Sequence, residues 1–453
     1  MRRLRQLAER TPADRERYVD LLRAAAITMV VIGHWSVTVI GHDAAGRPTG
    51  RSALPDLPWA YPLTWVAQVI PVFFLVGGYA NAASLTSRRR RGGDTAGWLL
   101  DRSARLVRPT TVLVLVLTAG ALAARLAGVE PAQVRTVVWF ATVPLWFLAA
   151  YLLVVPLTPV TYALHERFGL AVPVVLAALV GLGDLGRLTG PASLALGNYL
   201  FGWLALHQLG YGWYDAQHGV SRRIRRLPPT RRTGWPLLLG GATVLVLATT
   251  VGPYPVSMLS VPGLRLDNAA PPSLALLALA TAQLGLILVL REPAERWLRR
   301  PGPWQAVIAV NAVVLTIFLW HLSAAVLLIG GLDAVGLLPT PSVHSPAWLA
   351  WRVPWLLMLT VVLAALVAVF GPVEARTGHR SPTGPSTRND RARGALAVVG
   401  YGAVVAALVV NAVTPKDAPE PWGLPVAALV AYLVGAGLLR LLRAHPTQQT
   451  DMR

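Results

Sequence analysis

Two ionisable residues, Arg23 and His34, stand eleven positions apart in the first long apolar segment of the chain. Eleven residues make about three helical turns, so both side chains fall on nearly the same face of a helix. At about 1.5 Å of rise per residue, His34 lies roughly 16 Å beyond Arg23, which is about half the thickness of a bilayer core. The spacing therefore predicts a membrane-embedded site with Arg23 near one surface and His34 deep inside.

His34 has the chemistry of a general base. A neutral imidazole titrates near neutral pH and can accept a proton from a hydroxyl group. The alternative is a histidine that only donates a hydrogen bond to a neighbouring helix. Arg23 on the same face, with Asp20 one turn below it, favours the functional interpretation.

A row of basic residues precedes the third apolar segment. Arg102, Arg105 and Arg108 recur every three positions and fall along one side of a helical stretch. Guanidinium groups offer forked donors to anionic oxygens, so such a row suits the phosphates of a ligand. The alternative is charge that sets topology or contacts anionic lipid headgroups, and this is the better explanation for the run 88–91.

Aromatic residues and a second histidine are candidates for lining a cavity: Phe73, Phe74, Trp146 and His321. Two glycines follow the phenylalanine pair and permit close helix packing, so packing is the simpler explanation for that pair. The tryptophan could line a pocket or anchor its helix. His321, near mid-membrane, could face His34 or serve only as a structural hydrogen-bonding group, and His207 is expected near the membrane interface.

Several classes of protein are excluded by what the chain lacks. Without cysteine there is no disulfide, thiolate catalysis or cysteine-ligated metal. There is no glycine-rich nucleotide loop, no Gly-x-Ser-x-Gly elbow and no pair of metal ligands at helical spacing within an apolar segment, so no metal is expected. The net charge of +20 clusters in alternate gaps between apolar segments, which indicates membrane topology and not nucleic-acid binding.

Composition predicts an all-α polytopic membrane protein, because 54% of the 453 residues are hydrophobic and only 14% are charged. The basic N-terminal stretch lacks a cleavable signal pattern, so the first helix is expected to stay as an anchor. Twelve segments are long enough to span a bilayer: 20–40, 62–86, 109–127, 137–159, 170–186, 190–210, 235–252, 271–291, 304–330, 348–371, 394–413 and 423–442.

The distribution of charge predicts the orientation. Of the 41 arginine and lysine residues, 33 fall on the side of the N-terminus, counting those at helix ends, and 8 fall on the other side. By the positive-inside rule both termini are cytoplasmic, in a multi-pass protein of the plasma membrane. The expected organisation is a cytoplasmic segment at 1–19, a ten-helix domain at 20–372, a polar linker at 373–393, a further helix pair at 394–442 and a cytoplasmic tail at 443–453.

Several motifs in this order resemble the acyltransferase-3 family of integral-membrane acyltransferases, over about residues 15–372. They are Arg23 with His34, the Phe-Phe pair with its following glycines, the arginines before the third span, Leu-Trp-Phe-Leu in the fourth, and Leu-Trp-His late in the core. Two positions depart from the family pattern. Gly77 stands where the family usually has serine, and Val314-Leu315 stands where it has Ser-Tyr.

The resemblance implies an enzyme that moves an acyl group, often acetyl, from cytosolic acyl-coenzyme A to a hydroxyl. The acceptor would be a cell-envelope carbohydrate, a lipid-linked sugar or a small glycoside, and no cofactor would be bound permanently. His34 would be the essential histidine and Arg23 its partner. Arg105 and Arg108, joined by Arg102, would lie near the coenzyme A phosphates.

A twelve-helix secondary transporter is the alternative, since twelve spans with both ends inside also suit a carrier built of two halves. Against it, the second half of the chain has no counterpart of the His34 or Phe-Phe motifs. A membrane scaffold without catalysis would leave the Arg23 and His34 pair unexplained.

Overall fold

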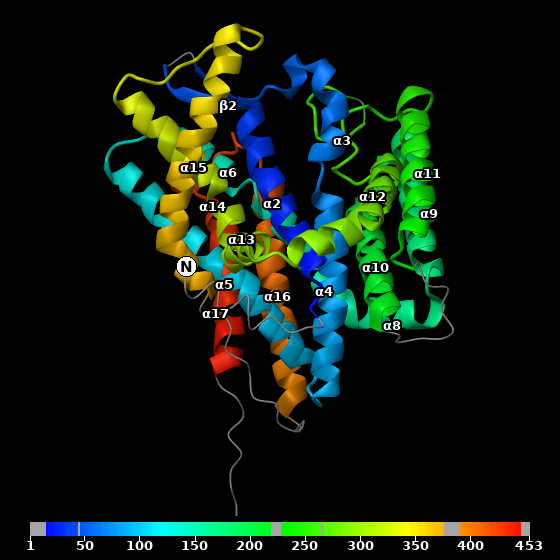
Figure 1. Cartoon of the computed structure of the whole chain (residues 1–453). Helices are drawn as coiled ribbons and strands as arrows, with labels where there is room; N and C mark the ends of the chain where they lie inside the picture. Colours follow the sequence, from blue (N-terminus) through cyan, green and yellow to red (C-terminus); the bar gives the residue numbers. More distant parts are fainter. Residues whose placement is uncertain (1–14, 44–45, 219–227, 265, 376–388, 445–453) are drawn as a thin grey trace, which may run out of the picture. The chain divides into compact units, whose positions relative to one another are not determined.

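The computed structural model describes residues 15–43, 46–218, 228–264, 266–375 and 389–444, and these are almost entirely helical (Figure 1). Eleven helical segments within the described ranges are long and apolar enough to cross a membrane. They are Arg17–Val37, Pro58–Arg90, Thr95–Leu126, Leu145–Phe168, Ala171–Thr189, Arg231–Thr250, Leu274–Leu298, Val314–Ala334, Pro346–Ala375, Ala392–Val413 and Val426–Arg443.

The sequence predicts twelve spans, and the one without a counterpart is 190–210. That stretch forms a short 3₁₀ helix followed by α10 (Asn198–His218). α10 is long enough to span, but it carries polar side chains that are buried inside the protein. They include Asn198, His207, Gln208 and Asp215.

The helices form two compact units that alternate along the chain. The first unit comprises Met1–Ala83, Leu157–Asn311 and Pro339–Arg352, and the second comprises Ser84–Pro156, Ala312–Leu338 and Val353–Arg453. In this division the helix pair predicted at 394–442 groups with the helices at 95–154 and 314–334.

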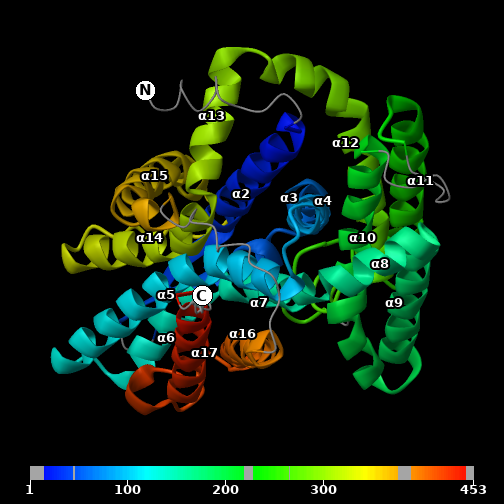
Figure 2. The same cartoon turned by 90° about the horizontal axis from the view of Figure 1, so that it is seen from below.

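The first unit contains most of the helices from the front half of the chain. They are α2 (Arg17–Val37), the first part of α4 (Ile70–Arg90), α8 (Thr158–Phe168), α9 (Ala171–Thr189), α10, α11 (Arg231–Thr250), α12 (Leu274–Leu298) and α13 (Pro301–Ala312). α11 and α12 run side by side along their length (Figure 2). Gly241 permits this, because a Cβ there would lie 2.5 Å from the backbone nitrogen of Ala282.

α4 and α10 approach each other equally closely. A Cβ on Gly78 would meet the carbonyl oxygen of His207 at 2.0 Å, and one on Gly210 would meet the carbonyl oxygen of Leu75 at 2.1 Å. Any side chain at either position would push the two backbones apart. The predicted close approach of a helix at the glycine pair is confirmed at Gly78.

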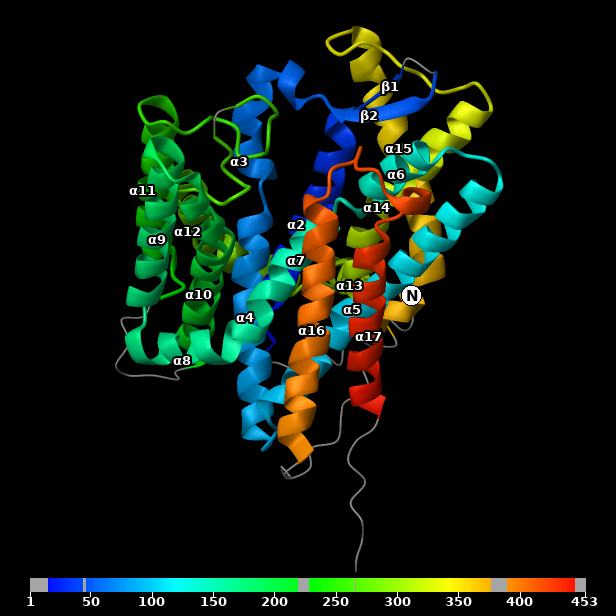
Figure 3. The ribbon, with the colours of Figure 1, turned by 180° about the vertical axis from the view of Figure 1, so that it is seen from behind.

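A short hairpin follows α2 (Figure 3). β1 (Thr38–His42) pairs with β2 (Pro48–Ser52) in antiparallel register, with Thr38 opposite Ser52. The all-α prediction omits this hairpin, and the first residues of β1 lie inside the predicted span 20–40. Arg352 anchors the hairpin by donating from Nη1 to the carbonyl oxygen of Thr38 at 2.8 Å.

The second unit contains α5 (Thr95–Leu126), α6 (Pro131–Thr142), α7 (Leu145–Val154), α14 (Val314–Ala334), most of α15 (Pro346–Ala375), α16 (Asn389–Val413) and α17 (Val426–Ala444). α16 and α17 lie side by side (Figures 1 and 3). A Cβ on Gly435 would lie 2.6 Å from the carbonyl oxygen of Gly400, so this pair also packs backbone to backbone.

Two predicted spans are interrupted. The stretch 137–159 is not one helix, because α6 ends at Thr142 and α7 begins at Leu145 directly after Pro144. Proline lacks an N–H donor, so Pro144 cannot continue the ladder of helical hydrogen bonds.

The predicted span 304–330 is likewise divided, between α13 and α14 at Val313. The Glu374 carboxylate accepts hydrogen bonds from the backbone nitrogens of Leu315 at 3.1 Å and Thr316 at 2.8 Å. A negative charge at the start of α14 satisfies its first free N–H groups and favours its dipole. The break therefore depends on a side chain nearly 60 positions along the chain.

Candidate active site

Arg23 is held in a network of side chains in the first unit. Its Nη1 lies 3.3 Å from Oδ1 of Asp20 and 3.4 Å from Oδ1 of Asn311. Asn311, on α13, in turn donates from Nδ2 to the backbone oxygen of Asp20 at 2.9 Å. The Arg23 side chain keeps 29% of its surface exposed, so its guanidinium is oriented without being enclosed. Nothing in the sequence singled out Asn311, which lies 288 positions from Arg23.

His34 lies on the same continuous helix, eleven residues further along α2. The helix continues only to Val37, so His34 sits one turn from the end at which the hairpin begins. Its side chain is half-buried, and its backbone oxygen accepts the Thr38 hydroxyl at 2.7 Å. The unbroken helix puts Arg23 and His34 on one face, as their spacing predicts.

The two phenylalanines on α4 have different surroundings. Phe74 is completely buried and stacks on Trp203 of α10, with ring centroids 4.6 Å apart and planes 10° from parallel. Phe73 is only half-buried. In the first unit, Phe74 therefore packs α4 against α10, and Phe73 is the residue of the pair with accessible surface.

The arginine row lies on α5 in the second unit, and α5 is one continuous helix from Thr95 to Leu126. Arg105 and Arg108 are exposed, whereas Arg102 is half-buried. The Arg102 guanidinium donates from Nη2 to the hydroxyl oxygen of Tyr151, on α7, at 3.1 Å. The row thus has one arginine oriented by a neighbouring helix and two that present their charge at the surface.

A chain of rings continues from Tyr151 across α7 to α14. Ring centroids are 6.2 Å apart between Tyr151 and Phe147, 5.4 Å between Phe147 and Phe318, and 6.0 Å between Phe318 and His321. Trp146 adjoins this chain through an edge contact with Phe147 at 6.3 Å. The second unit therefore connects Arg102 of the arginine row, the fourth-span aromatic motif and the second histidine through a chain of contacts.

His321 is completely buried at the end of this chain. Its Nδ1 lies 2.6 Å from the backbone oxygen of Phe318. A carbonyl oxygen can only accept, so Nδ1 carries the proton and the lone pair of the neutral ring lies on Nε2. Phe147 belongs to the Leu-Trp-Phe-Leu motif quoted above and Phe318 directly precedes the Leu-Trp-His motif, but Tyr151 carried no sequence signal.

Two further expectations are corrected by the contacts. His207 is completely enclosed within the first unit and hydrogen-bonds Asn81 at 3.0 Å, so it does not face the membrane interface. Arg88 is buried in the second unit and lies between two carboxylates, 3.4 Å from Asp94 and 3.1 Å from Asp101. It therefore ties the end of α4 to α5 and is more than a topology charge.

No group of three histidine, aspartate or glutamate side chains in the described part of the chain is placed to hold a metal ion. The candidate residues thus fall into two sets. Arg23, His34, Phe73 and Phe74 belong to the first unit, and Arg102, Arg105, Arg108, Trp146 and His321 belong to the second.

The apolar helices and their buried polar residues define a multi-pass membrane protein. A family model described as an acyltransferase domain, that of the acyltransferase-3 family, matches residues 16–373. This match covers well over half of the chain, so the protein belongs to that family and is an acyltransferase. Nothing in it supports the secondary-transporter alternative. Comparisons with curated proteins and with solved structures gave no significant match.

Proposed function

We propose that this enzyme transfers an acyl group, acetyl in the first instance, from acyl-coenzyme A to a hydroxyl of a cell-envelope carbohydrate, a lipid-linked sugar or a small glycoside. The choice of acyl-coenzyme A as the donor rests on the arginine row of α5. Tyr151 orients Arg102 in this row, and Arg105 and Arg108 are exposed. Coenzyme A bears several phosphates, and guanidinium groups on one side of a helix suit them. Acyl-coenzyme A acts as a co-substrate, with no permanently bound cofactor.

In the proposed reaction His34 is the general base. The acceptor hydroxyl oxygen bonds to the thioester carbonyl carbon while a ring nitrogen of His34 takes the hydroxyl proton. The C–S bond then breaks, and the proton passes to the departing sulfur, which restores the neutral ring and releases coenzyme A. A covalent acyl-histidine is the less economical variant, because it needs a second transfer step.

Arg23 has a supporting part in this scheme. Its guanidinium is fixed by Asp20 and Asn311 and is still partly exposed, so it can orient an anionic portion of the donor. Phe73 in the first unit, and Trp146 and His321 in the second, are each proposed to line a substrate cavity. Phe74 was a candidate for the same role, and its stack on Trp203 favours packing instead.

For topology, we propose twelve spans with α10 as the twelfth and with both termini in the cytoplasm of a bacterial cell. The charge asymmetry of the chain supports that orientation. The protein would lie in the plasma membrane, where acyl-coenzyme A is available on the cytoplasmic side. The bilayer and the carbohydrate acceptor are the proposed partners, and nucleic acid is not one of them.

The test uses membranes that contain the parent protein, His34→Ala or His42→Ala, each supplied with isotope-labelled acetyl-coenzyme A. Label in alkali-labile esters is the readout. Loss of a general base typically lowers the rate by about 10²–10⁴-fold, so label should almost vanish with His34→Ala. His42 lies at the exposed end of β1 and serves as the control, which should keep full label.

Each other result is decisive. Equal label with His34→Ala and the parent would remove His34 from the reaction. No label with the parent would contradict acetyl as the acyl group, or the presence of the acceptor in those membranes. Longer acyl-coenzyme A donors and added glycosides would then separate these two cases.

A further inference from the structure

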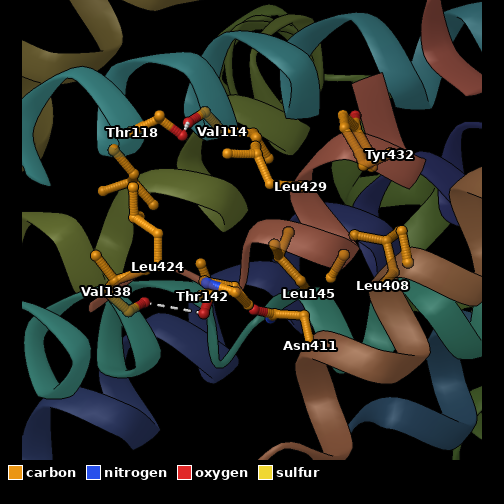
Figure 4. Close-up of a pocket in the computed structure, with 14 residues that line it drawn as sticks. Val114, Thr118, Val138, Thr142, Leu145, Leu408, Asn411, Leu424, Leu429 and Tyr432 are labelled. Carbon is orange, nitrogen blue, oxygen red and sulfur yellow. Dashed lines mark hydrogen bonds between the residues drawn. The ribbon is translucent and has the colours of Figure 1, made fainter. Parts of the chain in front are cut away.

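A cavity of about 50 Å³ lies within the second unit, where the C-terminal helix pair meets α5, α6 and α7 (Figure 4). Its walls are mostly aliphatic. Val114, Leu145, Ala407, Leu408, Ala428 and Leu429 contribute to them. Alanines on both α16 and α17 leave the space open, because larger side chains at these positions would fill it.

The hydroxyl groups around this cavity are already satisfied by backbone oxygens. Thr118 donates to Val114 at 2.8 Å, and Thr142 donates to Val138 at 2.9 Å. The Tyr432 hydroxyl lies 3.1 Å from the backbone oxygen of Val107. The Asn411 amide is the remaining polar side chain that lines the cavity. A buried water needs two to four polar partners, and one amide beside these satisfied hydroxyl groups offers few. The cavity therefore favours an apolar occupant over water.

The helices that form the cavity continue into surface that is apolar and exposed. Leu115 beside Val114 is 49% exposed, Val410 beside Asn411 is 47% exposed, and Val430 beside Leu429 is 54% exposed. All three belong to helical segments that qualify as membrane spans, so this surface faces hydrocarbon in a bilayer. Lipid chains are therefore the apolar material that would surround these helices in a bilayer.

We infer that the cavity between the C-terminal helix pair and α5, α6 and α7 binds the end of one hydrocarbon chain of a bilayer phospholipid. One water needs about 10–15 Å³ measured in the same way, so the space of about 50 Å³ takes roughly three to five groups of that size, enough for a chain end. Hydrocarbon entering from the bilayer gains no hydrophobic free energy. The gain is instead the dispersion contacts that an empty void would leave unmade.

This inference concerns the helix pair beyond residue 373 and does not rest on the proposed reaction. The lipid would serve as a filler that joins the pair to the rest of the unit. Tyr432 already connects α17 to α5 at this junction, because its hydroxyl oxygen lies 3.1 Å from that of Thr111 on α5.

The experiment is native mass spectrometry of the full chain, purified in mild detergent from membranes of known phospholipid content. The parent should retain one phospholipid under washing that strips the bulk lipid. Ala428→Phe fills the cavity and should lower that retained fraction at least fivefold. Ala427→Phe is the matched control, because Ala427 is the exposed neighbour on α17 and should leave retention unchanged.

A second pair of variants, with smaller changes, tests whether loss of folding explains any loss of lipid. Ala407→Leu is a smaller filling change, and Ala406→Leu is its exposed control on α16. Thermal melting of all four variants identifies any that has unfolded. Retention that falls in Ala407→Leu but not in Ala406→Leu, with melting preserved, supports the site. A parent without retained lipid, retention in both filled variants equal to that of the parent, or a retained mass that matches an isoprenoid glycolipid would overturn it.

Discussion

Replacing Tyr151 with phenylalanine tests whether the arginine row binds the donor. The change removes the hydroxyl that accepts from Arg102 Nη2 at 3.1 Å and leaves the ring contact with Phe147 in place. A hydrogen bond to a charged group contributes about 1.5–3 kcal/mol. Arg102 is half-buried, so the lower end applies, and about 1.5 kcal/mol corresponds to roughly tenfold. We therefore expect Tyr151→Phe to raise KM for acyl-coenzyme A about tenfold with little change in kcat.

The assay measures initial rates of ester formation against acyl-coenzyme A concentration in membranes of equal protein content. Tyr401→Phe is the control, because the Tyr401 hydroxyl donates to the backbone oxygen of Leu152 at 2.7 Å, one residue beyond Tyr151. It loses a tyrosine hydroxyl whose hydrogen-bond partner is a backbone oxygen and not the Arg102 guanidinium. KM unchanged within about twofold in Tyr151→Phe, or raised equally in both variants, would refute the reasoning.

Two other predictions concern the arginine row and helix packing. The double change Arg105→Ala with Arg108→Ala should weaken acyl-coenzyme A binding at least tenfold and reduce its salt dependence, as competition binding would report. The charge-matched control changes two exposed arginines at the end of α4, Arg89 and Arg90, to alanine. If acyl-coenzyme A binding weakens equally in this control, the effect comes from the loss of positive charge in general and not from the row on α5. Gly241→Ala should lower the melting temperature, because overpacking costs about 1–3 kcal/mol. Gly240→Ala, with open space around its Cβ, should leave it unchanged or raise it, and a shift of the same sign in both would contradict the packing described.

The helices could be predicted from the sequence because their cause is local. Long apolar runs must satisfy their backbone within a helix in lipid, so composition alone indicates a multi-pass helical protein. The period of 3.6 residues likewise places Arg23 and His34 on one face and the α5 arginines along one side. These features depend only on residues close together in the chain.

Other features depend on residues that are far apart in the chain. Asn311 reaches Arg23 across 288 positions, and Tyr151 reaches Arg102 across 49. The division of α13 from α14 involves Glu374, which no local pattern connects to Val313. Such contacts arise from how helices pack, and many packings share one hydropathy profile.

α10 has features of both kinds, some set by local sequence and some set by tertiary packing. Its helical state follows from local sequence, whereas the burial of its polar residues, with His207 bonded to Asn81 and enclosed, follows from packing within the first unit. The sequence by itself determined the helical membrane class, the family motifs and the shared face of Arg23 and His34. Only the tertiary structure decided which partners orient those side chains and which polar residues are buried, because burial and pairing are properties of surfaces that meet after the helices have formed.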